Sequence, residues 1–586
     1  MSAIQQLLTD HIDIWTAADT EKKSGRGRSS GNAGSVYGIK KLRELILELA
    51  VRGKLVPQDE KDEPASELLK RIAAEKVKLV AEGKIKKSKP LAEITDDEKP
   101  FNAPTNWEWV RLVVIGITTT GRTPSTQNST LYDGLIPFIG PGQITLTCEL
   151  LPADKWLSEA GRKETTIAKT GDILMVCIGG SIGKSAIADK EMGFNQQINC
   201  ISPLYVESKF AQISMMANSF QSKLLEFATG SATPIINKTK WEELLIPVSP
   251  LVEQHRIVAK VDELMTLCDQ LENQHNNAAE AHDKLVTHLL GTLTQSQNAE
   301  DFNTHWQRIS EHFDTLFTTE ASIDALKQTL LQLAVMGKLV PQDPNDEPAS
   351  ELLKRIQAEK AKLIAEGKIK KDKPLAMMSD EEKPFELPVG WEPVRLNELL
   401  SKIGAGSTPL GGKQVYATTG VPFLRSQNVW NEGLRLDDVA YIIAETHQKM
   451  SGTHVSSFDL LFNITGASIG RCAIVHDTFD TGNVSQHVVI IRSVSREIIQ
   501  FLHLVLISNY IQQKVMDVQV GVSREGLSIG KLGQFIIPIP SLSEQLRIVE
   551  KVEKLMAICD QLKARITSSN QLQRKLADIV IEQATS

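Results

Sequence analysis

The chain has 586 residues, of which 41% are hydrophobic, and this is enough for a sizeable core and roughly three to five domains. Its formal net charge of −7 gives no overall signal for nucleic acid, although a local basic surface stays open. The cysteines are scattered without zinc-type spacing, and no apolar run approaches the roughly 18 to 20 residues of a membrane span. We therefore expect a cytoplasmic protein without a metal site and without membrane contact.

We predict a helical region over residues 1–99. Residues 24–35 read SGRGRSSGNAGS, which is the composition of a flexible linker. Further on, Asp62 is placed to cap a helix with one apolar face, and Gly83 is placed to end it. Lysines follow that helix at once. A solvated helix end is the simpler interpretation of these lysines, and contact with a DNA backbone or a partner is the alternative.

The stretch CIGGSIGKS at 177–185 is similar to a phosphate-binding loop but misses its register. The position five before Gly183 is Ile178, where such a loop needs glycine. In the second half of the chain, Arg471 and Cys472 stand where a nucleotide site needs lysine and serine. Nucleotide hydrolysis is therefore not expected. We predict two strands joined by a tight turn, with a DNA contact from the basic residue as the alternative.

Two long helices are predicted from apolar residues that alternate spacings of four and three, the pattern of a coiled-coil seam. A helix of about 40 residues would be roughly 60 Å long, so two of them packed together would form a rod that fixes a distance. The seam residues are Ile257, Val261, Leu264, Cys268 and Leu271 in one helix and Ile548, Val552, Leu555, Cys559 and Leu562 in the other.

The chain consists of two copies of one unit. Residues 53–92 recur at 337–376 with six differences, and residues 246–271 recur at 537–562. Between these blocks, two stretches of about 140 residues keep a common skeleton but differ in most other positions. Two copies that share a scaffold but contact different things would show this contrast, and drift after duplication is the plainer alternative.

These features resemble the specificity subunit of type I restriction-modification enzymes, of the type IB kind, over essentially the whole chain. The resemblance rests on the paired IP-x-x-x-L-x-EQ-x-RIV-x-KV segments at 246–261 and 537–552. Each segment closes a divergent unit that begins near a tryptophan and contains a G-x-TP turn. The resemblance implies an α+β fold with two mixed α/β target recognition domains in a pseudo-twofold arrangement, separated by long antiparallel coiled-coil helices. The implied regions are 1–99 (N-terminal helices), 100–249 (first domain), 250–383 (central helices), 384–540 (second domain) and 541–586 (C-terminal spacer helix).

The same resemblance implies a non-catalytic subunit. Each domain would read one half of a bipartite, asymmetric double-stranded DNA target, and the helices would dock methyltransferase subunits and restriction subunits, the latter an ATP-dependent translocase and endonuclease. S-adenosylmethionine, ATP and Mg would bind those partners and not this chain. No Pro-Pro dipeptide occurs, so the N/D-P-P-Y/F motif of an adenine methyltransferase is absent. A tandem adaptor that binds protein partners through coiled coils and divergent heads is the alternative.

Side chains beside the shared motifs are the candidates for DNA contact, with polar groups for base edges and basic groups for phosphates. In the first domain they are Arg122, Thr123, Ser125, Gln143, Ser181, Lys184, Gln196, Gln197, Lys238 and Lys240. In the second domain they are Ser407, Thr408, Arg425, Gln427, Asn428, Arg471, Gln486, His487 and Arg524.

Overall fold

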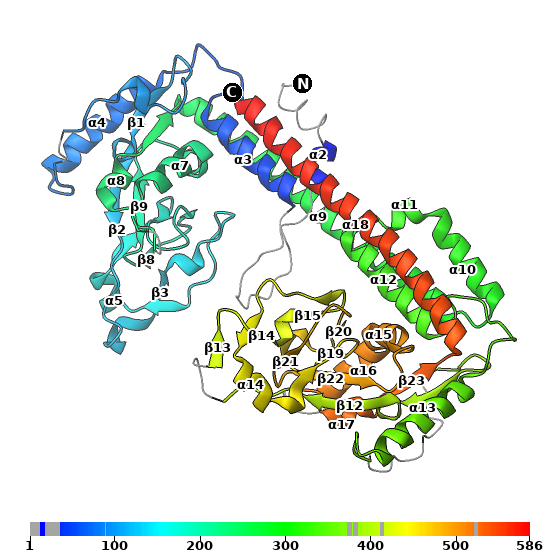
Figure 1. Ribbon diagram of the computed structural model, residues 1–586. Coiled ribbons are helices and arrows are strands. Elements are labelled where there is room, and N and C mark those ends of the chain that lie inside the picture. Colours follow the sequence, from blue (N-terminus) through cyan, green and yellow to red (C-terminus); the bar gives the residue numbers. More distant parts are fainter. Residues whose placement is uncertain are drawn as a thin grey trace. The chain divides into compact units, whose positions relative to one another are not determined.

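The computed structural model describes most of the chain, and the linker predicted at 24–35 lies outside the described part. Two compact units are present, residues 1–279 with 569–586 and residues 280–568. Each unit contains a domain of mixed helix and strand content and helices of its own (Figure 1). Among the described residues, no helix combines the length and the apolar character that crossing a bilayer requires. The described residues are 12–17, 36–87, 90–230, 233–371, 378, 382, 385–410, 415–520 and 526–585.

Strands of the first domain form two four-stranded sheets and a two-stranded ribbon. They are β1 (Glu108–Arg111), β2 (Gly116–Thr120), β3 (Tyr132–Ile139), β4 (Lys155–Leu157), β5 (Thr166–Ala168), β6 (Ile173–Val176), β7 (Ser185–Ile187), β8 (Met192–Phe194), β9 (Ile198–Pro203) and β10 (Leu245–Val248). One sheet has the antiparallel order β2-β9-β6-β7. The other has the order β4-β3-β8-β5, in which β3 and β8 are parallel. β1 pairs with β10, so the first and last strands close the domain.

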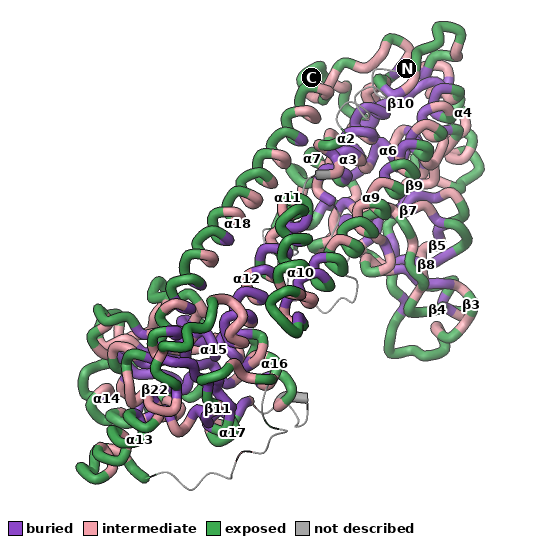
Figure 2. The backbone as a smooth tube through the Cα atoms, turned by 90° about the vertical axis from the view of Figure 1, so that its right-hand side faces the viewer, coloured by how far each residue is buried: buried purple, intermediate pink, exposed green. Residues whose placement is uncertain are grey.

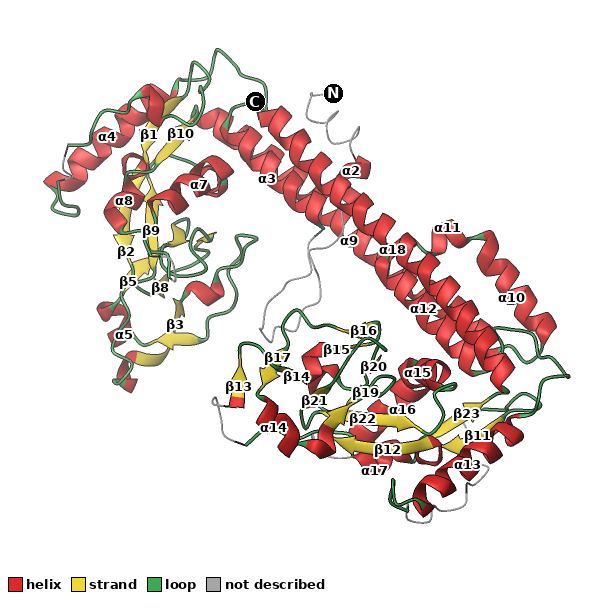
Figure 3. Ribbon diagram, in the orientation of Figure 1, coloured by secondary structure: helices red, strands yellow, loops and turns green. Residues whose placement is uncertain are grey.

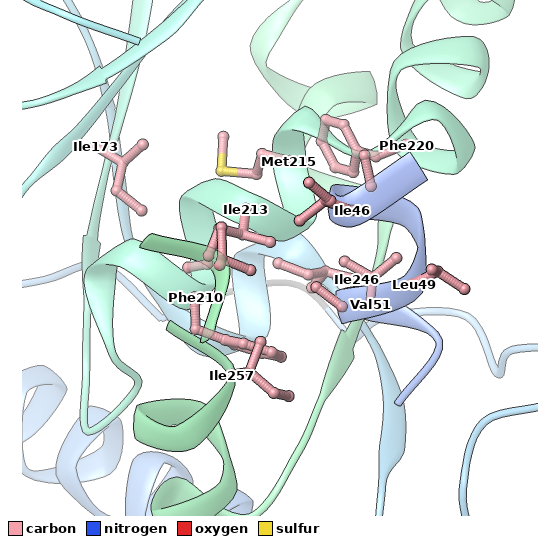
Figure 4. Packing of buried hydrophobic residues seen from close by; sticks show 14 of the residues in the cluster. Ile46, Leu49, Val51, Ile173, Phe210, Ile213, Met215, Phe220, Ile246 and Ile257 are labelled. Atoms are coloured by element: carbon pink, nitrogen blue, oxygen red, sulfur yellow. The ribbon is translucent and has the colours of Figure 1, made fainter. Parts of the chain in front are cut away.

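The first unit also contains shorter helices. They are α2 (Ile12–Ala17), α3 (Tyr37–Val51), α4 (Ala65–Ala81), α5 (Glu159–Glu164), α6 (Ser208–Met216), α7 (Asn218–Phe227) and α8 (Lys238–Glu242). Of these, α6 packs on the sheet at β7. Every residue of β6 is buried, and successive side chains of a strand point to opposite faces. Ile173 and Met175 therefore enter a core shared with α3 and α6, whereas Leu174 and Val176 enter a second core between the strands. Figure 4 shows the first of these cores.

The second domain repeats this construction. Its strands are β11 (Glu392–Arg395), β12 (Leu400–Ala405), β13 (Tyr416–Ala417), β14 (Val421–Leu424), β15 (Val429–Trp430), β16 (Gly433–Leu434), β17 (Ala440–Ile442), β18 (His454–Val455), β19 (Leu460–Asn463), β20 (Cys472–Ile474), β21 (Gly482–Val484), β22 (Val488–Ser493) and β23 (Ile536–Ile539). The order β12-β22-β19-β20 matches β2-β9-β6-β7, and β17-β14-β21-β18 matches β4-β3-β8-β5. The second domain adds β13 at the β17 edge and the β15–β16 hairpin. β11 pairs with β23 as β1 does with β10. The predicted duplication therefore extends to the fold of the divergent stretches.

The second unit also has its own helices, which are shown in red in Figure 3. They are α10 (Ala299–Glu311), α11 (Phe313–Leu316), α12 (Glu320–Val335), α13 (Ala349–Ala365), α14 (Ala444–Lys449), α15 (Ile499–Ile507), α16 (Asn509–Val520) and α17 (Ile529–Gly533). Figure 2 shows buried backbone concentrated at β22 and α15, at the centre of the second domain, and exposed backbone along much of α13.

Two helices are far longer than the rest, α9 (Leu251–Gln295) and α18 (Leu542–Thr585). In the first unit the beginning of α9 shares a core with α3 and with Ala577, near the end of α18. In the second unit the end of α9 shares a core with α12 and with Cys559, in the first half of α18. The two helices therefore run antiparallel, and a third helix packs on them in each unit.

The structure buries the predicted seam residues, the first ones of each helix against the neighbouring domain and the later ones in the cores that α9 and α18 share. Ile257, Val261, Leu264 and Cys268 are at most 3% exposed, and so are Ile548, Val552 and Cys559. Leu271, Leu555 and Leu562 are partly buried against the same cores.

The start of helix α4 differs from the prediction. Its N-cap position is Pro64, whose side chain has no hydrogen-bonding group, and Asp62 does not cap the helix. Asp62 instead accepts a hydrogen bond from Arg256 at 2.5 Å. Folding brings Arg256 of α9 close to Asp62, so the carboxylate binds this guanidinium and not the backbone N–H groups at the start of α4. Gly83 follows the helix with φ of +70°, as expected for a residue that ends a helix.

The Asp62–Arg256 pair belongs to a set of contacts that fastens the first domain to α9. Glu253, which is 1% exposed, accepts hydrogen bonds from the indole N–H of Trp107 (2.9 Å) and from Gln58 (2.6 Å). Burial raises the pKa of Glu253, and the hydrogen bonds from Trp107 and Gln58 oppose that effect. We call these five residues the first junction.

The second unit contains the same junction. Glu544 accepts hydrogen bonds from Trp391 (3.0 Å) and Gln342 (2.7 Å), and Arg547 donates to Asp346 at 2.6 Å. The two blocks that recur in the sequence therefore contact each other, one supplying Gln342 and Asp346 and the other Glu544 and Arg547. Their shared contacts give a physical reason for their similarity in the two copies.

Asp346→Asn is expected to lower the free energy of unfolding at pH 7 by about 1–3 kcal/mol, because it removes a charge-assisted hydrogen bond from a mostly buried carboxylate. Hydrogen bonding from Arg547 lowers the pKa of Asp346 below its ordinary value. Such a group stabilises the fold above its unfolded pKa of about 3.9, and the stabilisation is lost as the pH falls through the folded pKa. Urea unfolding should therefore show a smaller difference between variant and wild type near pH 3.5 than at pH 7.

The control for this variant is Glu347→Gln. Glu347 pairs with Arg355 at 2.7 Å, but both side chains are about half exposed. An exposed pair is worth at most about 1 kcal/mol, so this variant should stay close to wild type at both pH values. Equal losses in the two variants would contradict the assigned importance of the junction.

Candidate nucleic-acid interface

Four loops of the first domain meet beyond the ends of β2, β3, β6 and β8. The backbone N–H of Asn195, after β8, donates to the carbonyl of Ile139 at the end of β3 (3.1 Å). The N–H of Cys177, after β6, donates to the carbonyl of Gln197 (2.8 Å). We call this group the first loop cluster, which consists of residues 121–124, 140–143, 177–184 and 195–197.

The G-x-TP turn joins this cluster through a side-chain contact. Thr123 donates its hydroxyl hydrogen to the carboxamide oxygen of Gln196 at 2.5 Å. A Cβ atom on Gly121 would lie 2.0 Å from the carbonyl oxygen of Asn195, so only glycine allows the turn to approach so closely. The turn is therefore fixed against the segment between β8 and β9.

Several candidate side chains of the first domain point into solvent around this turn. Arg122, Ser125 and Gln196 are exposed. The side chain of Arg122 is 72% exposed and lies 3.8 Å from the carboxylate of Glu164, which is itself 53% exposed. An ion pair as open as this one is weak, so the guanidinium of Arg122 is available to a ligand.

Ser181 and Lys184 lie in the loop that joins β6 to β7, and the predicted pair of strands is confirmed. Gly183 has φ of +90°, and Gln221 of α7 donates to its carbonyl oxygen at 3.1 Å. Both Ser181 and Lys184 are half-buried. The loop is therefore held by a hydrogen bond from α7, and its basic residue, Lys184, lies at the edge of the cluster.

Two predicted glutamines are engaged within the domain. Gln143 accepts from the backbone N–H of Gly140 (3.0 Å) and donates to Asp154 (2.7 Å). Gln197 accepts from the side chain of Asn195 at 3.1 Å. Each carboxamide can still form further hydrogen bonds, but both residues also stabilise the conformation of their loops.

Lys238 and Lys240 lie on α8, outside the four loops of the cluster. Lys238 pairs with Glu242 at 3.2 Å, and Glu242 in turn accepts from Thr118 in the middle of β2. Helix α8 packs against residues 112–115, which precede β2, whereas the G-x-TP turn follows β2. The structure therefore does not gather these two lysines with the other candidates.

The second domain has an equivalent group, which we call the second loop cluster. The N–H of Ser485 donates to the carbonyl of Leu424 (2.9 Å), and that of Ile464 donates to the carbonyl of His487 (3.0 Å). A Cβ on Gly406 would lie 1.9 Å from the carbonyl oxygen of Val484, which repeats the close approach of the first turn. The cluster consists of residues 406–409, 425–428, 464–471 and 485–487.

Most second-domain candidates are exposed on this cluster. Thr408 donates to Gln486, as Thr123 does to Gln196. Ser407 is exposed, and exposed His487 shares a hydrogen bond of 2.7 Å with the hydroxyl of Thr465. Gln427 is also exposed and donates to Asp438 at 2.7 Å.

Asn428 is a correction to the predicted interface. Its side chain is 2% exposed, accepts from the N–H of Arg425 (2.9 Å) and donates to the carbonyl of Arg435 (3.0 Å). Because both ends of the carboxamide are used to hold its own loop, Asn428 is a structural residue. Arg425 is half-buried and donates to the carbonyl of Asp438 at 3.1 Å. Arg524 lies outside the described residues.

Two residues beside this cluster, Trp430 and Arg435, were not among the predicted candidates. The guanidinium carbon of Arg435 lies 3.6 Å from the centre of the Trp430 ring, and that of Arg471 lies 3.7 Å from it. Trp430 and Arg435 flank the short turn between β15 and β16, and Arg471 is 36 residues further on. The local signal was a tryptophan and an arginine on either side of an Asn-Glu-Gly turn, but nothing in the sequence indicated that Arg471 would stack on the same ring.

Comparisons with known proteins agree with this architecture. The family model described as "Type I restriction modification DNA specificity domain" matches residues 104–281 and 388–573, one match for each domain. The EcoEI specificity subunit of Escherichia coli is 41% identical over 99% of this chain and 100% of the relative. The EcoAI specificity subunit of Escherichia coli is 39% identical over the same shares.

A solved chain from work on complex assembly and conformational transition of the type I R-M system has the same fold. It aligns with a TM-score of 0.51 at 17% identity, covering 83% of this chain and 99% of that chain. The fold, the two family matches and the relatives lead to one assignment. This chain belongs to the specificity subunits of type I restriction-modification enzymes, and its two domains are target recognition domains.

Proposed function

We propose that this chain is the DNA-reading subunit of a type I restriction-modification complex, in which each domain reads one half of a bipartite, asymmetric target. One observation carries the proposal: the two loop clusters share their internal bonds but differ in the side chains around them. The Thr123–Gln196 bond recurs as Thr408–Gln486, whereas Lys184 is replaced by Arg471. A common frame with different polar and basic groups suits two readers of different base sequences.

We further propose that the chain is not itself an enzyme. Methyltransferase subunits and restriction subunits would dock on its helices and supply catalysis, and S-adenosylmethionine, ATP and Mg would bind those subunits. The relatives' names support this division, because they identify specificity subunits of restriction enzymes. The long helices also offer extended surfaces outside the domains, since 44 and 45 residues are helical without interruption.

The test is DNA selection with the assembled complex. The chain is mixed with a cognate adenine methyltransferase subunit, and bound duplexes are recovered from a random pool and sequenced. A split site with a constant unread gap is the expected result. Complexes of protein alone, with no enriched sequence, would overturn the proposal and favour an adaptor that binds proteins.

Inserting seven residues after Leu271 is expected to lengthen the unread gap or to abolish binding. Seven helical residues add about 10 Å and preserve the apolar seam, because they complete one heptad. The measurement is the gap length in DNA selected by the variant complex. An insertion of four residues, which breaks the seven-residue repeat, serves as the comparison and should weaken the fold. An unaltered gap with intact binding would contradict a spacer role for α9.

A further inference from the structure

Beside the second loop cluster, Trp430 of the β15–β16 hairpin is held between two arginines, Arg435 directly after the hairpin and Arg471 of the cluster. The guanidinium carbons of Arg435 and Arg471 both lie within 3.7 Å of the Trp430 ring centre. Two groups of that size cannot occupy the same face at this distance, so they cover opposite faces of the indole. The attraction of a cation to the face of an aromatic ring holds each guanidinium close to the ring.

Backbone and side-chain bonds fix the three residues. The indole N–H of Trp430 donates to the carbonyl of Gln427 at 2.8 Å, which sets the plane of the ring. The Asn463 N–H donates to the carbonyl of Arg471 (2.8 Å), and Asn431 accepts from the N–H of Cys472 (3.1 Å). The hairpin with Trp430 is therefore joined to the strand that follows Arg471, and the side chain of Arg471 starts from a rigid position.

The polar edge of Arg471 is not used inside the domain. Within the described part of the chain, its guanidinium has no hydrogen bond and no ion pair with a carboxylate. Arg435 differs, because it lies 4.0 Å from the carboxylate of Glu432. The Glu432 side chain is 71% exposed, so its pairing with Arg435 is weak. A stacked guanidinium whose donors are free suits a partner with two adjacent acceptors.

The first domain has no tryptophan stacked between arginines at the equivalent positions. Backbone hydrogen bonds define these positions: Leu151 donates to Gln143 where Arg435 donates to Asn428, and Lys184 accepts from Val176 where Arg471 accepts from Asn463. The first domain thus has leucine in place of Arg435 and lysine in place of Arg471. Counting from the capped 3-10 turns, threonine at 145 stands in place of Trp430. The stack of Trp430 between two arginines therefore distinguishes the second domain from the first.

We propose that Arg471 reads a guanine in the half-site of the second domain and that Trp430 is its positioning residue. Guanine presents O6 and N7 side by side in the major groove, and arginine is the side chain that pairs with both. Stacking on Trp430 holds the planar fork in place, so little freedom is lost when the pair forms. This inference rests on the proposed function, since it assigns one base contact to a domain proposed to read DNA.

The test compares DNA selected by complexes of the methyltransferase subunit with wild type, Arg471→Lys or Trp430→Leu. Lysine keeps the charge but loses the bidentate fork. Arg471→Lys is expected to reduce the preference for guanine at one position of one half-site by about 5- to 150-fold and to leave other positions unchanged. Trp430→Leu should relax the same position. An unchanged base preference at the half-site of the first domain shows in each case that the variant is folded and assembled.

Arg496→Lys is the matched control, because Arg496 also lies over an aromatic ring, Phe458, at 5.1 Å but outside the cluster. It should leave the selected sequence unchanged. If Arg471→Lys instead weakens binding equally for all sequences, or if Arg471→Ala lowers the salt dependence by about one charge without relaxing any base, Arg471 contacts a phosphate and the inference fails. Failure of wild type to select any split site would overturn the proposed function as well.

Discussion

Exchanging residues 105–241 for the corresponding segment of a relative, such as the EcoEI specificity subunit, is expected to change one half of the DNA target and leave the other half and the gap unchanged. The structure gives the physical reason. The core that contains Leu174, Val176 and Phe194 lies wholly within the exchanged segment, so the donor brings its own core. β1 would come from the donor and β10 from this chain, but their pairing uses backbone groups that every sequence provides.

Two features of the donor decide whether the exchange folds. It has to supply a tryptophan in place of Trp107, whose indole N–H bonds to Glu253, and apolar side chains in place of Phe210 and Ile213, which pack against α3. DNA selected by the exchanged complex is the measurement. A change in both halves of the target would contradict independent reading by the two domains, and an unchanged target would place the reading residues outside 105–241.

Ile548→Ala is expected to lower the free energy of unfolding of the second unit by about 2–5 kcal/mol, the range for removing a large aliphatic side chain from a packed core. Ile548 is fully buried and belongs to the core that contains Trp391 and Phe501. The substitution therefore leaves a cavity where α18 meets the second domain. Urea unfolding followed by tryptophan fluorescence measures the change.

Ile558→Ala is the matched control on the same helix, since Ile558 is 53% exposed. Its effect should stay within about 0.5 kcal/mol. Similar losses of unfolding free energy in Ile548→Ala and Ile558→Ala would mean that contacts other than those with the second domain stabilise α18.

The repeated frame was predictable because it depends on local and periodic features. An apolar run, a glycine-containing turn and a second short run predicted β6 and β7, and the structure has that pair of strands. Spacings of four and three predicted the long helices, because a residue such as Cys268 has to lie one or two turns from its seam neighbours to share their face. These signals do not depend on which distant segment completes the core.

The remaining features depend on contacts between distant residues. Asp62 could cap its own helix, and nothing in the sequence indicated that Arg256, 194 residues away, would bind it instead. Asn428 carries a carboxamide, which is suited to reading a base edge, but its side chain points into the loop that it stabilises. The stacking of Arg471 on Trp430 depends on two loops that only folding brings together.

The central claim is that two unlike domains on one chain read two unlike half-sites. The most direct measurement is a map of methylated adenines in the genome of cells that express this chain with the methyltransferase subunit proposed as its partner, with cells that lack the chain as the comparison. The account predicts methylation at a single two-part sequence, with different bases in the two parts and a gap of constant length. Methylation at one continuous sequence, at two identical half-sites, or at sites that do not depend on the chain would contradict it.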